Sequence, residues 1–194
     1  MKKVKSKKYL DVIETARELF WKHGFRRVSI QEICEKASMS KMTFYKYFPN
    51  KTELAKTVFL NVVEEGQVQF KNLILENISA EEKIEKLILF KAETTNNISK
   101  EFLNDFYLGS EKELQQFVEQ TTKKAWNSLL KDYQTAQEKG IFRKDFNPEF
   151  FLKVSFKLVE ILQDEELVQF YNTPQDLILE FARFVAYGIS PRSK

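Results

Sequence analysis

Residues 28–54 decide the fold, and they read VSIQEICEKASMSKMTFYKYFPNKTEL. Ser29 followed three residues later by Glu32 is a capping box, in which each side chain can satisfy a backbone N–H group of the other residue. This spacing predicts that a short helix begins at residue 30 and runs to about Ala37.

A second short helix is expected directly afterwards. Ser40 is a good N-cap residue and predicts a helix over 41–48, which Pro49 ends. Asn50 repeats the capping pattern at the start of a long helix that extends to about Asn77. The stretch therefore predicts two short helices joined by a three-residue turn and followed by a long helix.

The chain before this stretch predicts one amphipathic helix. Its apolar residues recur at steps of three and four, and they are Tyr9, Val12, Ile13, Ala16, Leu19 and Phe20. Gly24 suits the positive φ that often follows a last helical turn, and His23 lies where positive charge suits the helix dipole. We therefore expect His23 to be structural rather than catalytic.

The rest of the chain shows only helix signals. Good N-cap residues precede four further segments, and they are Ser79, Ser110, Asn147 before Pro148, and Thr173 before Pro174. Gly140 closes the segment that begins near Glu111. No alternating polar and apolar run ends in an Asn-Gly or Asp-Gly turn, so no hairpin is predicted. We expect an all-α protein of about nine helices.

Composition excludes several classes of function. The chain has 194 residues with only 5 glycines, which are too far apart to form a phosphate-binding loop. Its single cysteine, Cys34, cannot form an intramolecular disulfide, and one cysteine and one histidine, His23, are too few for a zinc cluster within one chain. Zinc chemistry and Cys–His catalysis are therefore not expected. Cys34 is expected to be a packing residue rather than a redox sensor. We expect no cofactor, no metal site and no enzymatic activity.

No membrane segment is expected. The apolar runs are only a few residues long, whereas a spanning helix needs about 20. Residues 1–8 are basic like the start of a signal peptide, but charged residues interrupt the segment 9–20 that follows. We therefore expect a cytoplasmic protein without a membrane partner.

Charge is unevenly distributed along the chain. Residues 1–60 hold 14 Lys and Arg against 6 Asp and Glu, a net charge of +8, whereas residues 61–194 hold 17 against 22, a net charge of −5. A basic first third beside an acidic remainder indicates an anionic partner for the N-terminal part. The lysines of residues 1–8 can equally form a solvated tail, so charge alone does not decide between these interpretations.

Charge and helix pattern together indicate a helix-turn-helix, a motif that places its second helix in the major groove of DNA. Phe44 and Phe48 are one helical turn apart and are expected to be buried. The residues that then point outward are Lys41, Met42, Tyr45 and Lys46. Cationic and aromatic side chains on one exposed helix suit phosphates and base edges.

The motif also carries a resemblance to a known family. Phe20, Gly24-Phe25 and residues 28–54, above all the run TFYKYFPNK at 43–51, closely resemble the TetR family of bacterial transcriptional regulators. The resemblance implies a three-helix DNA-binding domain over 1–55 and a helical effector-binding and dimerisation domain over 56–194. It further implies a homodimer that represses from a palindromic operator of double-stranded DNA and leaves it when a small-molecule effector binds.

The family motif implies roles by position. Phosphate contacts are implied for Thr43, Tyr45, Tyr47 and Lys51, base-edge contacts for Gln31, Lys41 and Met42, and either for Lys46. The turn has Ser38 where the family usually has glycine, so a positive φ there would cost about 1 kcal/mol. Met42 replaces a residue that is often small or proline, so we expect an operator sequence of its own.

Two amphipathic helices near the C-terminus carry the candidate dimer interface. Its residues are Phe151, Val154, Leu158 and Ile161 on the first helix and Leu177, Phe181 and Phe184 on the second. These faces can be buried within their own domain or pair with a second subunit as four helices. The family resemblance favours the dimer.

Aromatic residues of the middle helices are the candidates for effector contact. They are Phe90, Phe102, Phe106, Tyr107, Phe117, Trp126 and Tyr133. Such residues also form ordinary core, but walls of this kind without histidine favour an apolar or aromatic ligand.

Three alternatives remain beside the ligand-responsive regulator. A regulator of the same fold that answers to a protein partner or to no effector predicts a filled C-terminal core. An all-helical enzyme would need a nucleophile with its base, a cofactor loop or a metal cluster, and the sequence shows none of these. A membrane-surface protein would carry its lysines along an amphipathic helix, whereas here they precede it.

Overall fold

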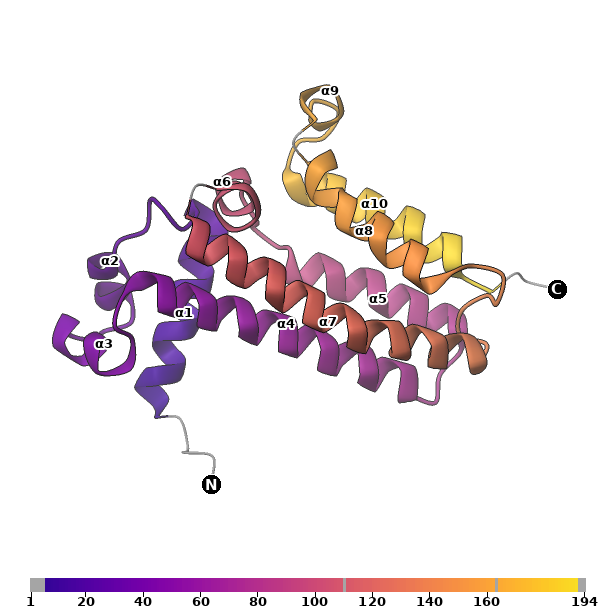
Figure 1. Ribbon diagram of the computed structural model, residues 1–194, viewed down its shortest axis with the longest axis horizontal. Helices are drawn as coiled ribbons and strands as arrows, with labels where there is room; N and C mark the ends of the chain where they lie inside the picture. The colour runs from indigo at the N-terminus through magenta and orange to yellow at the C-terminus, as the bar shows by residue number, and fades with distance from the viewer. Residues whose placement is uncertain (1–5, 110, 163, 192–194) are drawn as a thin grey trace. The chain divides into compact units, whose positions relative to one another are not determined.

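The computed structural model describes residues 6–109, 111–162 and 164–191 (Figure 1). These residues form ten α-helices and one π-helical turn, without any strand, so the prediction of an all-α protein is confirmed. The elements in chain order are α1 (Lys7–His23), α2 (Ile30–Lys36), α3 (Lys41–Tyr47), α4 (Lys51–Leu75), α5 (Ala80–Thr94), α6 (Lys100–Leu103), η1 (Asn104–Leu108), α7 (Lys112–Glu138), α8 (Pro148–Ile161), α9 (Glu165–Val168) and α10 (Pro174–Ile189).

Side-chain caps start the helices at the predicted places. The backbone N–H of Glu32 donates to Ser29 Oγ over 3.1 Å at the start of α2. At α5 and α10 the capping box is complete, with Ser79 and Thr173 as N-cap residues. Each cap satisfies one of the backbone donors that a first turn leaves unpaired. The predicted cap Ser110 lies outside the described residues.

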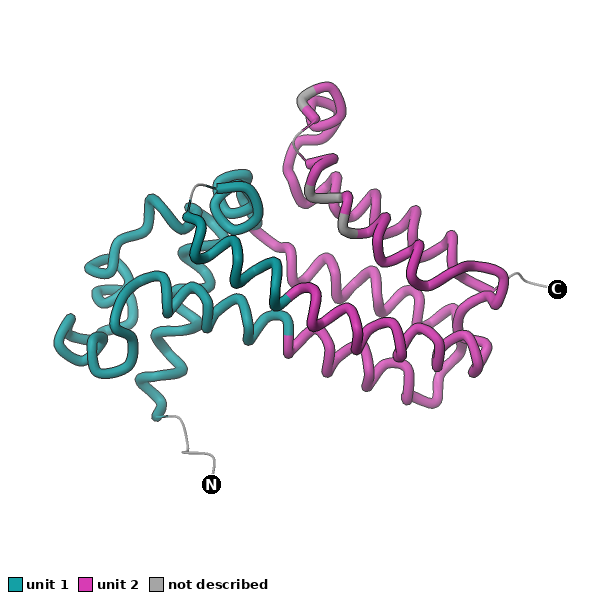
Figure 2. Tube along the Cα trace, in the orientation of Figure 1, with its two compact units in different colours: residues 1–63, 98–121 teal, residues 64–97, 122–194 magenta. Residues whose placement is uncertain are grey.

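The chain divides into two compact units (Figure 2). Unit 1 takes residues 1–63 and 98–121, and unit 2 takes residues 64–97 and 122–194. The helix-turn-helix region thus shares its unit with a segment some 50 residues further along the chain, which contains α6 and η1. The division into domains at residue 55 stays a prediction.

Unit 1 has an aromatic core. Phe20 of α1 and Phe44 of α3 are fully buried, as are Phe102 and Phe106 of the segment 98–121. The ring centroids of Trp21 and Phe102 lie 4.1 Å apart, and those of Phe102 and Phe106 lie 4.5 Å apart. Because buried aromatic rings contribute large apolar areas, the segment 98–121 is an integral part of this core.

Unit 2 is a helical bundle in which α10 packs against α5 and α8. Its core consists of Phe70, Ile74, Ile84, Ala136, Ile141, Phe142, Ala186 and Ile189. Lys83 of α5 is buried, and its ammonium group donates to the carbonyl oxygens of Ile74 (2.9 Å) and Glu76 (2.6 Å) at the end of α4. The lysine thereby satisfies carbonyl groups that the last turn of α4 leaves unpaired.

No helix in the described part of the chain is long and apolar enough to span a membrane.

Candidate nucleic-acid interface

The turn between α2 and α3 contains a residue in the left-handed region. Ser38 has a φ of 51°, and the backbone N–H of Met39 donates to the carbonyl oxygen of Cys34 over 2.9 Å. Ser38 therefore adopts the positive φ that was considered for a turn in which the family usually has glycine. Cys34 itself is buried, as predicted, and burial raises the pKa of its thiol.

The helix α3 buries one face and exposes the other. Phe44 is fully buried, and Phe48, which follows the helix, stacks on Tyr9 of α1 with ring centroids 5.4 Å apart. On the other face Met42 is 71% exposed and Tyr45 is 54% exposed. Since a large apolar side chain gains nothing from facing water, this face is suited to a partner surface.

Polar contacts link the exposed ends of α2 and α3. The ammonium group of Lys41 donates to Gln31 Oε1 over 3.3 Å, and Gln31 Nε2 donates to Glu35 Oε1 over 2.9 Å. Three residues from two helices thus share one network. It holds the amide of Gln31 with its oxygen toward the cation and its nitrogen toward the carboxylate.

The other residues for which the motif implies DNA contact lie around the same helix. Lys46 is exposed, whereas Thr43 and Tyr47 are half-buried. The hydroxyl groups of Tyr47 and Ser6 share a hydrogen bond of 2.8 Å, which ties the end of α3 to the N-cap of α1. Gln31, Lys41, Met42, Thr43, Tyr45, Lys46 and Tyr47 therefore lie on or beside α2 and α3.

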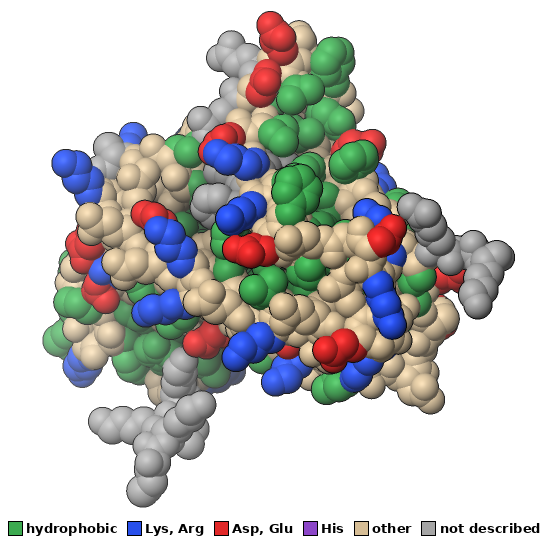
Figure 3. All heavy atoms as spheres, turned by 45° about the vertical axis from the view of Figure 1, so that its right-hand side comes forward, with side chains coloured by type: hydrophobic (Ala, Val, Ile, Leu, Met, Phe, Trp, Pro, Cys, Tyr) green, Lys and Arg blue, Asp and Glu red, His purple; other side chains and the backbone are tan. Residues whose placement is uncertain are grey.

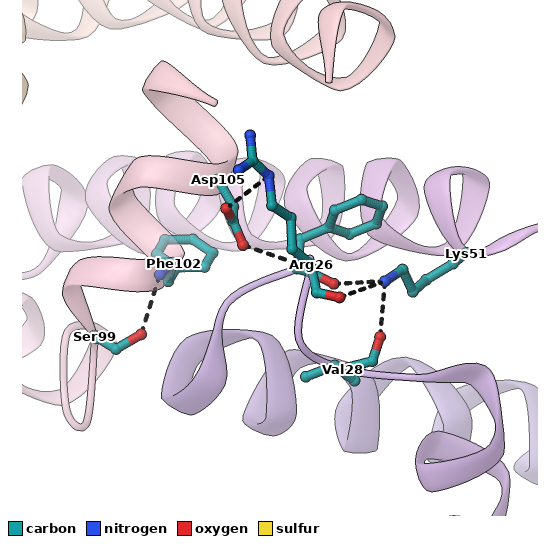
Figure 4. Close-up of polar contacts among 7 residues, drawn as sticks. Arg26, Val28, Lys51, Ser99, Phe102 and Asp105 are labelled. Carbon is teal, nitrogen blue, oxygen red and sulfur yellow. Dashed lines mark hydrogen bonds and ion pairs between the residues drawn. The ribbon is translucent and has the colours of Figure 1, made fainter. Parts of the chain in front are cut away.

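Lys51 differs from the other predicted contacts. Its ammonium group donates to the carbonyl oxygens of Phe25 (2.7 Å), Val28 (2.8 Å) and Arg26 (3.3 Å) in the loop between α1 and α2 (Figure 4). Burial lowers the pKa of this group, and the negative charge of Asp105 partly offsets that shift. Its role at a phosphate stays a prediction.

Sequence reasoning missed Asp105, which contacts the same loop. The backbone N–H of Arg26 donates to Asp105 Oδ2 over 2.8 Å, and Arg26 Nε lies 3.4 Å from Asp105 Oδ1. The one available signal was an acid between Phe102 and Phe106 in a segment rich in large apolar residues, because a buried carboxylate needs a partner.

The aromatic residues considered for effector contact fall in both units. Phe102, Phe106, Tyr107 and Phe117 belong to unit 1, and Phe90, Trp126 and Tyr133 belong to unit 2. Phe102 and Phe106 are 2% and 0% exposed and contact rings of α1, so they form core. The rings of Tyr133 and Phe70 stack with centroids 5.0 Å apart. Contact with an effector stays a prediction for this group.

The residues considered for a dimer interface differ in their exposure to solvent. Val154 and Phe184 are 36% and 77% exposed, whereas Leu177 is buried. Phe151 contacts the rings of Tyr133 and Phe146. Ile161 and Phe181 are half-buried, and the side chain of Leu158 lies outside the described part of the structure.

Further apolar residues of α8 and α10 lie in solvent beside them. Phe150 is 68% exposed and Tyr187 is 61% exposed, and each lies one turn from Val154 or Phe184 on its helix. We call Phe150, Val154, Phe184 and Tyr187 the C-terminal apolar face. Figure 3 shows hydrophobic side chains gathered in the upper part of the view, where α8 to α10 lie.

Within the described residues, no group of three or more His, Cys, Asp or Glu side chains could hold a metal ion. The geometry instead defines a class: a helix-turn-helix protein whose second helix presents a cationic and aromatic face.

Comparison with known proteins agrees with this class. Residues 12–58 match the family model described as bacterial regulatory proteins, tetR family. The chain is 24% identical to the uncharacterized HTH-type transcriptional regulator YdgC of Bacillus subtilis (strain 168), with 98% of this chain and 96% of that protein covered.

Two solved structures share the fold. The fatty acid degradation regulator FadR from Bacillus halodurans has a TM-score of 0.69 at 19% identity, covering 98% of this chain and 100% of that one. FadR from Bacillus subtilis, in complex with stearoyl-CoA, has a TM-score of 0.65 at 18% identity, covering 93% and 99%. Residues 12–58 thus carry the match to the tetR family, and the chain as a whole is similar in sequence and in fold to helix-turn-helix transcriptional regulators.

Proposed function

We propose that the chain is a homodimeric repressor that binds a palindromic operator and leaves it when an apolar effector binds. The observation that carries the proposal is the exposed face of α3, on which Met42 and Tyr45 lie in solvent beside lysines. Lys41 and Lys46 supply the positive charge that phosphates need. Gln31 and Lys41 contact each other and can be placed at base edges together.

The size of α3 supports a dimer. The helix runs only from Lys41 to Tyr47 and can read only a short half-site. A helix-turn-helix dimer reads two half-sites about 34–36 Å apart, so a two-fold partner supplies the second α3. The C-terminal apolar face is the surface on which we place that partner, because exposed aromatic side chains of this size are typical of interfaces.

The effector proposal rests on the aromatic composition of the chain and on one relative. FadR from Bacillus subtilis was solved with stearoyl-CoA, and it shares the fold of this chain. We propose a ligand with a long acyl chain or an aromatic body, which the half-buried rings of Phe90, Trp126 and Tyr133 in unit 2 would contact.

A release experiment tests this function. The full-length protein is first bound to a fluorescent duplex selected from the DNA beside its own gene. Stearoyl-CoA, stearate and free coenzyme A are then titrated in, the acylated compounds below the concentration at which they form micelles. We expect release by a compound that carries the acyl chain and none by coenzyme A alone, because the apolar walls give the headgroup no partner.

One observation favours a second candidate, a regulator of the same fold that responds to a protein partner or to no effector. Phe102 and Phe106, two of the residues considered for effector contact, are fully buried in unit 1. Failure of all three compounds, and of uncharged aromatic compounds, to release the DNA would favour this second candidate.

A further inference from the structure

The loop between α1 and α2 spans residues 24–29 and determines where α2 begins. Its last residue, Ser29, is the N-cap of α2, so any displacement of the loop also displaces the helix. Two charged side chains from outside the loop contact its backbone, one on α4 and one on η1 (Figure 4).

Lys51 holds the loop from α4. A lysine ammonium group has three N–H donors, and the three loop carbonyls of Phe25, Arg26 and Val28 take them. The ammonium nitrogen also lies 4.3 Å from the centre of the Phe25 ring. In this arrangement Lys51 has no donor left for a phosphate.

Asp105 holds the loop from η1. Its side chain is 10% exposed, and it accepts the backbone N–H of Arg26. A Cβ atom on Gly24, whose φ is 77°, would lie 2.7 Å from Asp105 Oδ2, so the loop and η1 are in close contact. The backbone N–H of Ser99 also donates to the carbonyl oxygen of Trp21 over 2.9 Å, which joins α6 to α1.

We propose that Asp105 and Lys51 are positioning residues for DNA binding, which hold the α1–α2 loop from two sides and so fix the helix-turn-helix. This inference rests on the proposed function only in that it requires a DNA-binding α3. A chain that lacks one of these contacts spends more time with α2 and α3 displaced. Its apparent affinity for DNA then falls in proportion to the fraction of molecules that keep the DNA-binding conformation.

Electrostatics gives Asp105 a distinctive test. Removing an acid from a DNA-binding protein should leave its affinity for DNA unchanged or raise it, because repulsion from phosphates falls. A positioning role predicts the opposite, a loss of affinity for DNA when the acid is removed. We expect Asp105→Ala to bind the selected duplex about tenfold more weakly, since a charged hydrogen-bond acceptor is lost. Asp105→Asn, which keeps an acceptor oxygen, should recover most of that loss.

Glu101→Gln is the matched control, because Glu101 is an exposed acid of the same segment. It should bind DNA as tightly as the unaltered protein or slightly more tightly. Equal or tighter binding by Asp105→Ala, with both variants folded by circular dichroism, would overturn the role of Asp105.

Salt dependence separates positioning from phosphate contact at Lys51. Each lysine that neutralises a phosphate contributes about 0.9 to the slope of log K against log salt. We expect Lys46→Met to reduce the slope by about that amount. Lys51→Met should weaken binding about tenfold and leave the slope unchanged, because its ammonium group acts on the loop. A reduced slope for Lys51→Met would assign Lys51 to a phosphate instead.

Hydrogen exchange tests the loop without DNA. The Arg26 amide should be protected in the unaltered full-length chain and should exchange at least about tenfold faster in Asp105→Ala. An unprotected Arg26 amide in the unaltered protein would overturn the inference even if DNA binding is normal. Protected Arg26 in a protein that binds no duplex selectively would contradict the proposed function alone.

Discussion

At the scale of single residues, Ser38 carries backbone strain that sequence reasoning could foresee. Its φ of 51° costs a non-glycine residue about 1 kcal/mol. We expect Ser38→Gly to raise the free energy of unfolding by at most about 0.5 kcal/mol, since glycine removes the strain but loses more entropy on folding. Chemical denaturation measures the change.

Asn97 offers the control for Ser38. It also has a positive φ, 58°, but asparagine tolerates this region better than serine. Asn97→Gly should therefore change stability less than Ser38→Gly. Equal gains at both positions would show that the strain at Ser38 is not specific to serine.

Tyr107 gives a prediction of pH dependence. Burial raises the pKa of Tyr107 to about 12. Because an unfolded tyrosine has a pKa of about 10, the folded state holds the proton more tightly. Its contribution to stability is therefore fully present below pH about 10 and is lost as the pH rises toward about 12. The free energies of unfolding of the unaltered protein and Tyr107→Phe, measured against pH, should converge over that range.

The curves for the two proteins would run parallel between pH about 10 and 12 if Tyr107 ionised normally in the folded protein. The comparison with Tyr107→Phe cancels the ionisation of other groups, because they titrate in both proteins.

Residues with local signals were predictable, and residues that depend on distant partners were not. The caps Ser29, Ser40 and Thr173 act on backbone groups three residues away, so their sequence context suffices. Asp105 acts on Arg26, which lies 79 residues away, and only the folded chain brings the two together. The same holds for Lys51, whose partners in the α1–α2 loop were not apparent from its motif.

At the scale of elements, the start of α3 links stability to DNA binding. Ser40 is the N-cap of α3, and its hydroxyl accepts the backbone N–H of Thr43 over 3.1 Å. Ser40→Ala should lower the free energy of unfolding by about 1 kcal/mol. It should also weaken DNA binding, because the first turn of α3 frays.

Ser79→Ala is the matched control for an N-cap. Ser79 makes the same kind of cap at α5, which lies in unit 2. Ser79→Ala should lower the free energy of unfolding by a similar amount, about 1 kcal/mol, and should change the affinity for DNA by no more than about twofold. A similar loss of DNA affinity in both variants would mean that global stability, and not the order of α3, governs binding.

Helices with a strong sequence signal were predicted, and short helices without one were not. The long helices α4 and α7 were expected at nearly their observed bounds, because capping residues precede both and Gly140 follows the second. The four-residue helices α6 and α9 and the π-helical turn η1 were not expected, since so few residues give no periodicity to read. Their positions depend on packing against other elements.

At the scale of the whole molecule, the C-terminal apolar face predicts the oligomeric state. Phe184 is 77% exposed on α10. Phe184→Glu should convert the proposed dimer to monomers in analytical ultracentrifugation, because a buried unpaired charge is strongly unfavourable. The monomer should bind an operator roughly a hundredfold more weakly, since it loses the second half-site.

Leu89→Glu is the control for placing a glutamate at an exposed apolar position. Leu89 is 58% exposed on α5 and is not part of the C-terminal apolar face. This variant should stay dimeric. A dimeric Phe184→Glu protein with unaltered DNA affinity would place the interface elsewhere.

The most direct test of the account is fluorescence anisotropy of the full-length protein on duplexes that tile the DNA beside its own gene, at two salt concentrations. We expect saturable binding to one or a few duplexes, with two chains per site, that survives moderate salt because base contacts add to the phosphate contacts. Binding that is weak, equal for all duplexes and abolished by the higher salt concentration would contradict sequence-selective recognition by the helix-turn-helix.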